Sequence, residues 1–187
     1  MFRLAKPILV SAAVGALAFS SVAAAESFGI GRIAAPEEIA GWDIDIRPDG
    51  LGLPEGEGSV LDGEVLYEAQ CAACHGLFGE GEGRWPVISG GIGTLDRERP
   101  TKTVGSYWPY ASTLYDYIYR AMPFTAPRSL SAEDTYAISA YVLYLNELVD
   151  DDFVLSNENL ASIEMPNKDG FFVDPRPDAA NPLCMDN

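Results

Sequence analysis

The pattern of hydrophobic and polar residues predicts three helices in the middle of the chain. The first is expected over 63–70, with Asp62 as its N-cap and a run of good helix formers leading to residue 71. Gly63 and Tyr67 lie four residues apart and therefore share one helix face. Because glycine is unfavourable inside a helix, Gly63 indicates that another helix crosses closely at this point.

The other two predicted helices each carry an apolar stripe. The second is expected over 109–121, because proline suits a first helical position and apolar residues then recur three and four apart. Ser131 is expected to cap the third helix, with Asp134 completing a near capping box. The stripe of this third helix consists of Ile138, Tyr141, Val142 and Leu145. We expect its middle to cross the first helix near Gly63 and Tyr67.

The segments on either side of the helices are expected to be ordered but mostly irregular. The N-terminal arm, 26–58, is rich in glycine, proline and acidic residues, which leaves room only for a helical turn at 36–40. Trp42 and Ile44 are expected to pack this arm on the surface. Prolines also exclude long regular structure from 148–187. That tail has too many apolar residues for simple disorder, so it is expected to wrap the domain.

The first 25 residues have the pattern of a secretory signal peptide. Arg3 and Lys6 precede an apolar run over 8–22, which ends in the small residues 23–25. An uncleaved anchor is the alternative, but the run is short for a membrane span. Cleavage would leave 162 of the 187 residues, which suffices for one domain with extensions. We therefore expect an exported, periplasmic protein with no membrane span after cleavage.

The strongly acidic composition narrows the class of partner. The net charge is −16, and removal of the two basic leader residues would take it to −18. Such a charge argues against binding to nucleic acid and to anionic membrane surfaces. It fits either basic protein partners or simple solubility.

The candidate chemistry lies in Cys71-Ala72-Ala73-Cys74-His75, the attachment signature of c-type haem. One helical turn places Cys71 and Cys74 on one face, where their sulfurs can bond to the two haem vinyl groups. His75 is then the first axial ligand of the iron. A zinc site would want four nitrogen or sulfur ligands, and a thioredoxin-like pair would want a βαβ context. Neither alternative fits this chain as well.

The sixth iron ligand is expected to be Met122, with Met165 in reserve. His75 is the only histidine, so a second imidazole is excluded. Of the four methionines, Met1 leaves with the signal peptide and Met185 lies in a polar tail. Pro123 disfavours helical dihedrals at Met122, which frees the methionine side chain to turn toward the iron. A methionine is more often core filler than ligand.

The glycine-rich stretch 76–106 is expected to be a long loop that approaches the haem ring. Its Gly-x-Gly pieces are not a dinucleotide site, because no strand precedes them and no helix follows. The Pro86 carbonyl is the expected acceptor for the second ring nitrogen of His75. Residues whose polar ends could meet haem propionates are Arg84, Trp85, Arg97, Arg99, Tyr107 and Trp108. For each of these arginines, the alternative is a side chain exposed to solvent.

Cys184 is expected to be a free thiol, with an intermolecular disulfide as the alternative.

Taken together, these residues resemble class I cytochrome c. The resemblance rests on Gly63, Tyr67, the haem motif 71–76, Pro86, Met122-Pro123 and the Ser131 helix. It implies an all-α domain, here 59–147, in which the first and last helices cross and haem is held by histidine and methionine. The chain is thus expected to have a class I cytochrome c fold with ordered, mostly irregular N- and C-terminal extensions.

A closer similarity is to the cytochrome subunit of sulfane dehydrogenase, from the periplasmic Sox system of thiosulfate oxidation. It rests on the segments 42–50, 105–111 and 120–124. The resemblance implies a molybdenum-cofactor subunit as electron donor and a small cytochrome c as acceptor. Some members carry two haems, whereas this chain has one attachment motif, so one haem c is expected. Single-haem cytochromes of sulfite dehydrogenases remain an alternative.

Three functions follow from these observations. The first is an electron-transfer subunit of an oxidoreductase complex, without catalysis of its own. The second is a free, diffusible electron carrier with the same haem chemistry. The third is a haem enzyme with an open sixth position, if no methionine binds the iron.

Overall fold

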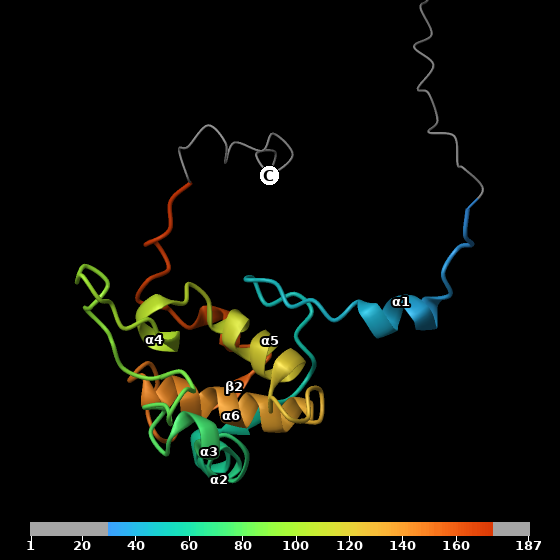
Figure 1. The fold of residues 1–187 in the computed structure, drawn as a ribbon. Helices are drawn as coiled ribbons and strands as arrows, with labels where there is room; N and C mark the ends of the chain where they lie inside the picture. The colour runs from blue at the N-terminus through green and yellow to red at the C-terminus, as the bar shows by residue number, and fades with distance from the viewer. Residues whose placement is uncertain (1–29, 174–187) are drawn as a thin grey trace, which may run out of the picture.

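The computed structural model describes residues 30–173, and their regular secondary structure is mostly helical, as expected (Figure 1). The predicted signal peptide (1–25), Cys184 and Met185 lie outside this part of the chain. The elements in order are α1 (Pro36–Trp42), β1 (Glu57–Ser59), α2 (Val60–Gln70), α3 (Ala72–His75), α4 (Val104–Tyr107), α5 (Ala111–Ala121), α6 (Ala132–Leu145), β2 (Val154–Ser156) and the 3₁₀ helix η1 (Leu160–Ser162). Within 30–173, the structure has no helix that combines the length and the apolar character needed to cross a membrane.

Two of the predictions about where the helices begin were wrong, and one is confirmed. The N-cap of α2 is Ser59, whose hydroxyl accepts a hydrogen bond from the Asp62 amide at 3.1 Å, so the prediction of Asp62 as cap was wrong. Helix α5 starts at Ala111 instead of Pro109, because the backbone stays extended through Tyr110. The Ser131 cap is confirmed, since its hydroxyl accepts from the Asp134 amide at 3.0 Å.

The crossing of α2 and α6 is confirmed and has no room for a side chain. A Cβ on Gly63 would lie 1.9 Å from the Ala137 carbonyl oxygen and 2.9 Å from the Tyr141 Cβ. One turn further along α2, the rings of Tyr67 and Tyr141 lie 5.1 Å apart. Glycine at residue 63 therefore allows the two helix backbones to approach closely. Figure 1 shows α2 beside α6.

The opposite face of α6 packs against α5 and the C-terminal tail. The rings of Tyr115 and Tyr136 are 4.3 Å apart between the two helices. Leu155 and Leu160 have no exposed surface, and Met165 is 3 % exposed. The first half of the tail therefore belongs to the same hydrophobic core as the helices.

A two-stranded antiparallel pair joins the two extensions, which the sequence analysis did not predict. Strand β1 pairs with β2, with Gly58 opposite Leu155. A Cβ on Gly58 would lie 2.3 Å from the Ala137 amide nitrogen, so this strand also lies directly on α6. The pair ties the start of α2 to the segment that follows α6.

The N-terminal arm contacts the body only after its helix. Helix α1 confirms the expected turn at 36–40 and runs two residues further, but it has no buried residue. Trp42 is 87 % exposed, so its predicted packing on the surface was wrong. Packing begins at Ile44, which is half-buried, and the side chains of Ile46 and Leu53 contact the core cluster. The tryptophan lies before the first of these anchors and projects into solvent.

Candidate functional site

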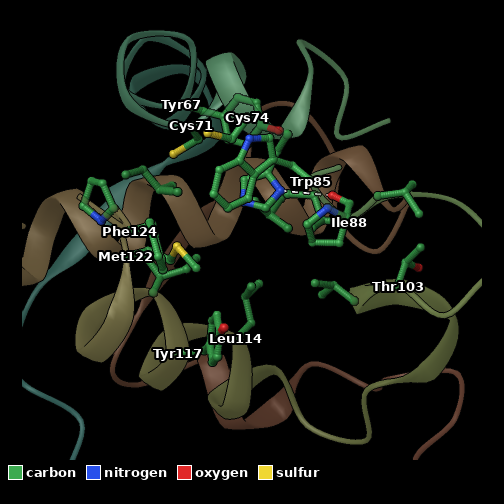
Figure 2. Close-up of a pocket in the computed structure, with 18 of the residues that line it drawn as sticks. Tyr67, Cys71, Cys74, Trp85, Ile88, Thr103, Leu114, Tyr117, Met122 and Phe124 are labelled. Carbon is green, nitrogen blue, oxygen red and sulfur yellow. Dashed lines mark hydrogen bonds between the residues drawn. The ribbon is translucent and has the colours of Figure 1, made fainter. Parts of the chain in front are cut away.

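A cavity of about 440 Å³ lies between α2–α3, the loop that follows, α5 and α6. Figure 2 shows Tyr67, Cys71 and Cys74 on one side of it and Leu114 and Tyr117 on the other. Its apolar wall includes Val87, Ile88, Val104, Ile118, Leu130, Ile138 and Val142. A cavity of this size and character suits a large, mostly apolar cofactor.

The cysteine motif forms a tight turn at the edge of the cavity. Helix α2 ends at Gln70, and the Cys74 and His75 amides then donate to the Cys71 carbonyl at 3.0 and 2.9 Å. Both cysteines are half-buried and line the cavity. The pKa of the Cys71 thiol is raised to about 11, mainly by burial and to a smaller extent by the neighbouring Cys74. A thioredoxin-like pair needs a lowered pKa, so this environment argues against that alternative.

A backbone carbonyl holds the imidazole of His75 in one orientation. Its Nδ1 lies 3.1 Å from the Pro86 carbonyl oxygen, which is the contact expected from the sequence. Because a carbonyl only accepts, Nδ1 carries the proton and Nε2 keeps its lone pair free for a metal. The loop that brings Pro86 here closes on Gly81, whose amide donates to the His75 carbonyl at 2.7 Å. A Cβ on Gly81 would lie 2.7 Å from the Trp85 carbonyl oxygen.

Of the two methionines considered as ligands, only Met122 lies at the cavity. It follows the last residue of α5 with extended backbone (φ −113°, ψ 153°), as the following proline predicted. Figure 2 shows its side chain at the cavity, near Phe124. Met165 is buried in the core and is not among the lining residues.

The remaining predicted residues divide into two groups. Trp85 and Trp108 line the cavity, as does Pro86. Arg84, Arg97 and Arg99 are exposed and do not line it. The guanidinium of Arg84 instead lies 4.8 Å from the Trp85 ring centre. Tyr107 also lies outside the lining, with its ring 5.4 Å from that of Phe171.

The polar lining residues that the sequence analysis missed include Lys102 and Thr103. The Thr103 hydroxyl caps α4, a short helix inside the expected loop, by accepting from the Ser106 amide at 3.1 Å. The Lys102 ammonium lies 4.9 Å from the Tyr107 ring centre. A capping pair spaced three apart was the available signal for Thr103, whereas nothing in the pattern marks Lys102.

Asn146 holds the loop side of the cavity in place from the end of α6. Its side chain is buried and uses its full hydrogen-bonding capacity. Oδ1 accepts from the Gly90 and Gly105 amides at 3.2 and 3.1 Å. Nδ2 donates to the Ile88 and Val142 carbonyls at 3.1 and 2.8 Å. Since Ile88 and Val142 both line the cavity, this one amide fixes two of its walls.

The Asn146→Ala variant is therefore expected to be destabilised by about 3 kcal/mol, because the bonds to the buried Gly105 amide and Val142 carbonyl are lost together with the part-buried bonds to Gly90 and Ile88. Chemical denaturation followed by circular dichroism measures this change. The control is Asn157→Ala, since the Asn157 side chain is only half-buried and accepts one long bond, 3.4 Å, from the Gly56 amide. Equal losses in the two variants would contradict the role of Asn146.

The donor set of the cavity fits a covalently attached haem. Two cysteines and an oriented histidine lie at one edge, a methionine approaches from a different element, and apolar side chains form the walls. Residues of these types attach haem and bind its iron in cytochromes c. The geometry thus agrees with the motif that the sequence alone indicated.

Comparisons with known proteins agree with this assignment. The family described as cytochrome c oxidase, cbb3-type, subunit III matches residues 58–142. The chain is 30 % identical to a thiosulfate dehydrogenase of Allochromatium vinosum over 120 residues, which are 61 % of this chain and 38 % of that protein. It is 42 % identical to cytochrome c-554(547) of Halothiobacillus neapolitanus over 33 residues, 18 % of this chain and 36 % of that one. The chain thus spans little more than a third of these two relatives.

A solved structure is similar over much more of the chain. It is the crystal structure of the sulfane dehydrogenase SoxCD from Paracoccus pantotrophus. The identity is 51 %, the TM-score is 0.78, and the match covers 86 % of this chain and 79 % of that one. The chain belongs to the class I cytochromes c, which carry haem c, and within them to the family of the cytochrome c of sulfane dehydrogenase.

Proposed function

We propose that the protein is a periplasmic cytochrome with one haem c that serves as an electron-transfer subunit. It accepts electrons from the molybdenum-cofactor subunit of a dehydrogenase acting on sulfane or sulfite sulfur, and passes them to a small cytochrome c. The observation that carries this proposal is the 51 % identity to a chain of sulfane dehydrogenase SoxCD over 86 % of the chain. So long a match includes most of the residues outside 59–147, where a minimal carrier would have no counterpart.

The site residues take the following roles in this proposal. Cys71 and Cys74 would attach the haem, and His75 and Met122 would bind its iron. A bound haem supplies one-electron oxidation and reduction at iron. The Pro86 carbonyl keeps the His75 ring in place, and the apolar walls keep water out of the cavity that would hold the haem. If His75 and Met122 both bound the iron, no position would be left on it for a substrate, which favours electron transfer over catalysis.

The number of haems and the location rest on the sequence. The chain has a single Cys-x-x-Cys-His motif and a single histidine, which support one haem. The signal-peptide pattern of the first 25 residues supports export to the periplasm. Residues 59–147 then form the cytochrome domain, with the arm and the tail as extensions.

Purification from the native periplasm tests this function. The affinity-tagged chain should carry one covalently bound haem, and it should bring down a protein that contains molybdenum. Iron and molybdenum analysis of the eluate, together with the mass of the isolated chain, provides the measurement. An eluate that contains iron but no molybdenum would contradict the subunit role and favour the free carrier.

A further inference from the structure

Helix α1 is a short helix whose apolar side chains have no partner within the part of the chain that the structure describes. It has seven residues and buries none of them. Ile33, which precedes it, is 95 % exposed, and Ile39 and Trp42 are 53 % and 87 % exposed. Ile39 and Trp42 are three residues apart and share a face. We call Ile33, Ile39 and Trp42 the arm face. In Figure 1, α1 stands clear of the other helices.

Local contacts preform this helix although no core supports it. Pro36 occupies the first helical position, and the Glu38 carboxylate accepts from the Ala35 amide at 2.8 Å. Arg32 holds the same carboxylate with two hydrogen bonds. An isolated helix of fewer than about 12 residues is marginal in water, because its stability normally comes from packing of one face. A preformed helix that exposes a tryptophan therefore points to packing against another molecule.

The base of the arm is fixed beside the cavity. The Arg120 guanidinium donates to the Ile44 carbonyl at 3.2 Å and pairs with Asp45 at 3.3 Å. Its other partner is Asp116, at 2.8 Å on the same face of α5. Arg120 stands two residues before Met122, so the base of the arm is anchored at the end of α5 that leads into this lining residue. Two residues that line the cavity, Phe124 and Tyr117, are 66 % and 50 % exposed.

Charge and similarity indicate which kind of molecule covers the arm face. The carboxylates of Glu37 and Asp43 flank the arm face on a chain of net charge −16, which complements a basic surface. The match to sulfane dehydrogenase SoxCD covers 86 % of the chain, whereas residues 59–147 make up less than half of the chain. The extensions are therefore part of what this chain shares with a chain of a sulfane dehydrogenase.

We propose that the arm face docks into an apolar groove with a basic rim on the molybdenum-cofactor subunit, and thereby holds that subunit against the Met122 side of the cytochrome. This inference rests on the proposed function and adds the surface through which the donor binds. Large aromatic side chains that enter a groove tend to dominate binding energy, so Trp42 is expected to be the main anchor.

The test compares two double variants in the full-length haem protein. Ile39→Ala with Trp42→Ala removes most of the arm face while keeping a good helix former at each position. Leu61→Ala with Val65→Ala is the matched control, since these α2 residues are 62 % and 69 % exposed and do not line the cavity. The probe is the molybdenum protein that co-purifies with the wild-type chain, and its dissociation constant is measured by calorimetry.

We expect the arm variant to bind this protein at least about tenfold more weakly than wild type, and the control to bind normally. The visible spectrum, the midpoint potential and reduction by dithionite should be unchanged in both. Arm-variant binding as tight as wild type, or an equal loss in the control, would overturn the docking site and leave the proposed function intact. An arm variant that loses only self-association or vesicle binding, and still binds the dehydrogenase, would also overturn the docking site. If no molybdenum protein co-purifies with wild type, the proposed function fails, and the docking site with it.

Discussion

The Met122→Leu variant is expected to lose methionine ligation of the haem iron. The ferric protein should lose the weak absorption band at the red edge of the visible spectrum, and cyanide and carbon monoxide should bind without slow displacement of a ligand. Since methionine ligation raises the potential, the midpoint should fall by a substantial part of the roughly 0.8 V range that axial ligands span. Redox titration followed by absorbance measures both changes.

Met165→Leu is the matched control for this experiment. Both substitutions remove a thioether and keep the side-chain volume nearly constant, so each should cost less than about 1.5 kcal/mol of stability. Met165 is buried in the core away from the cavity lining, so its replacement should leave the spectrum and the midpoint as they are. A spectral change in the Met165 variant and none in the Met122 variant would contradict the axial assignment and favour the reserve residue.

The Gly63→Ala variant is expected to be the most destabilised of the conservative substitutions. The new methyl carbon would lie 1.9 Å from the Ala137 carbonyl oxygen, which forces α2 and α6 apart along their crossing. Alanine improves the helix propensity by up to about 1 kcal/mol, but the overlap is expected to cost about 3–5 kcal/mol and to dominate. The net loss of about 2–4 kcal/mol should lower the melting temperature of a chain of this size by roughly 4–16 °C.

The same substitution at Gly41 serves as the control, because Gly41 is also helical and a Cβ there would meet nothing within 4 Å. Gly41→Ala should therefore leave the melting temperature of the body unchanged. Thermal unfolding followed by circular dichroism compares the two variants. A Gly63→Ala protein that melts within about 2 °C of wild type would show that the helices do not touch as described.

The parts of the fold that sequence could predict depend on local rules or on one specific motif. The Ser131 cap follows from a hydroxyl placed three residues before an acidic residue, and it is present. The glycine inside the first helix predicted a close crossing, and the Ala137 backbone lies there. The spacing of Cys71, Cys74 and His75 predicted a haem site, and these residues lie at one cavity edge.

The parts that sequence could not predict depend on contacts between distant residues. Strands β1 and β2 have three residues each and pair across about half of the chain, so neither shows a pattern of its own. Ser59 and Asp62 are both good caps, and only the chain path into α2 selects the serine. Lys102 reaches the cavity because the loop folds back, which no periodicity reveals. Likewise, Met122 differs from Met165 in that it lines the cavity, which the sequence does not show.

Anaerobic reduction of the haem by the native complex tests the central claim, electron relay from a dehydrogenase, most directly. Stopped-flow absorbance follows the ferric complex after addition of a sulfur substrate, with a small cytochrome c present as acceptor. The account predicts that the haem of this chain becomes ferrous first, in its methionine-bound form, and that the acceptor is reduced only afterwards. Reduction of the acceptor while this haem stays ferric would contradict it.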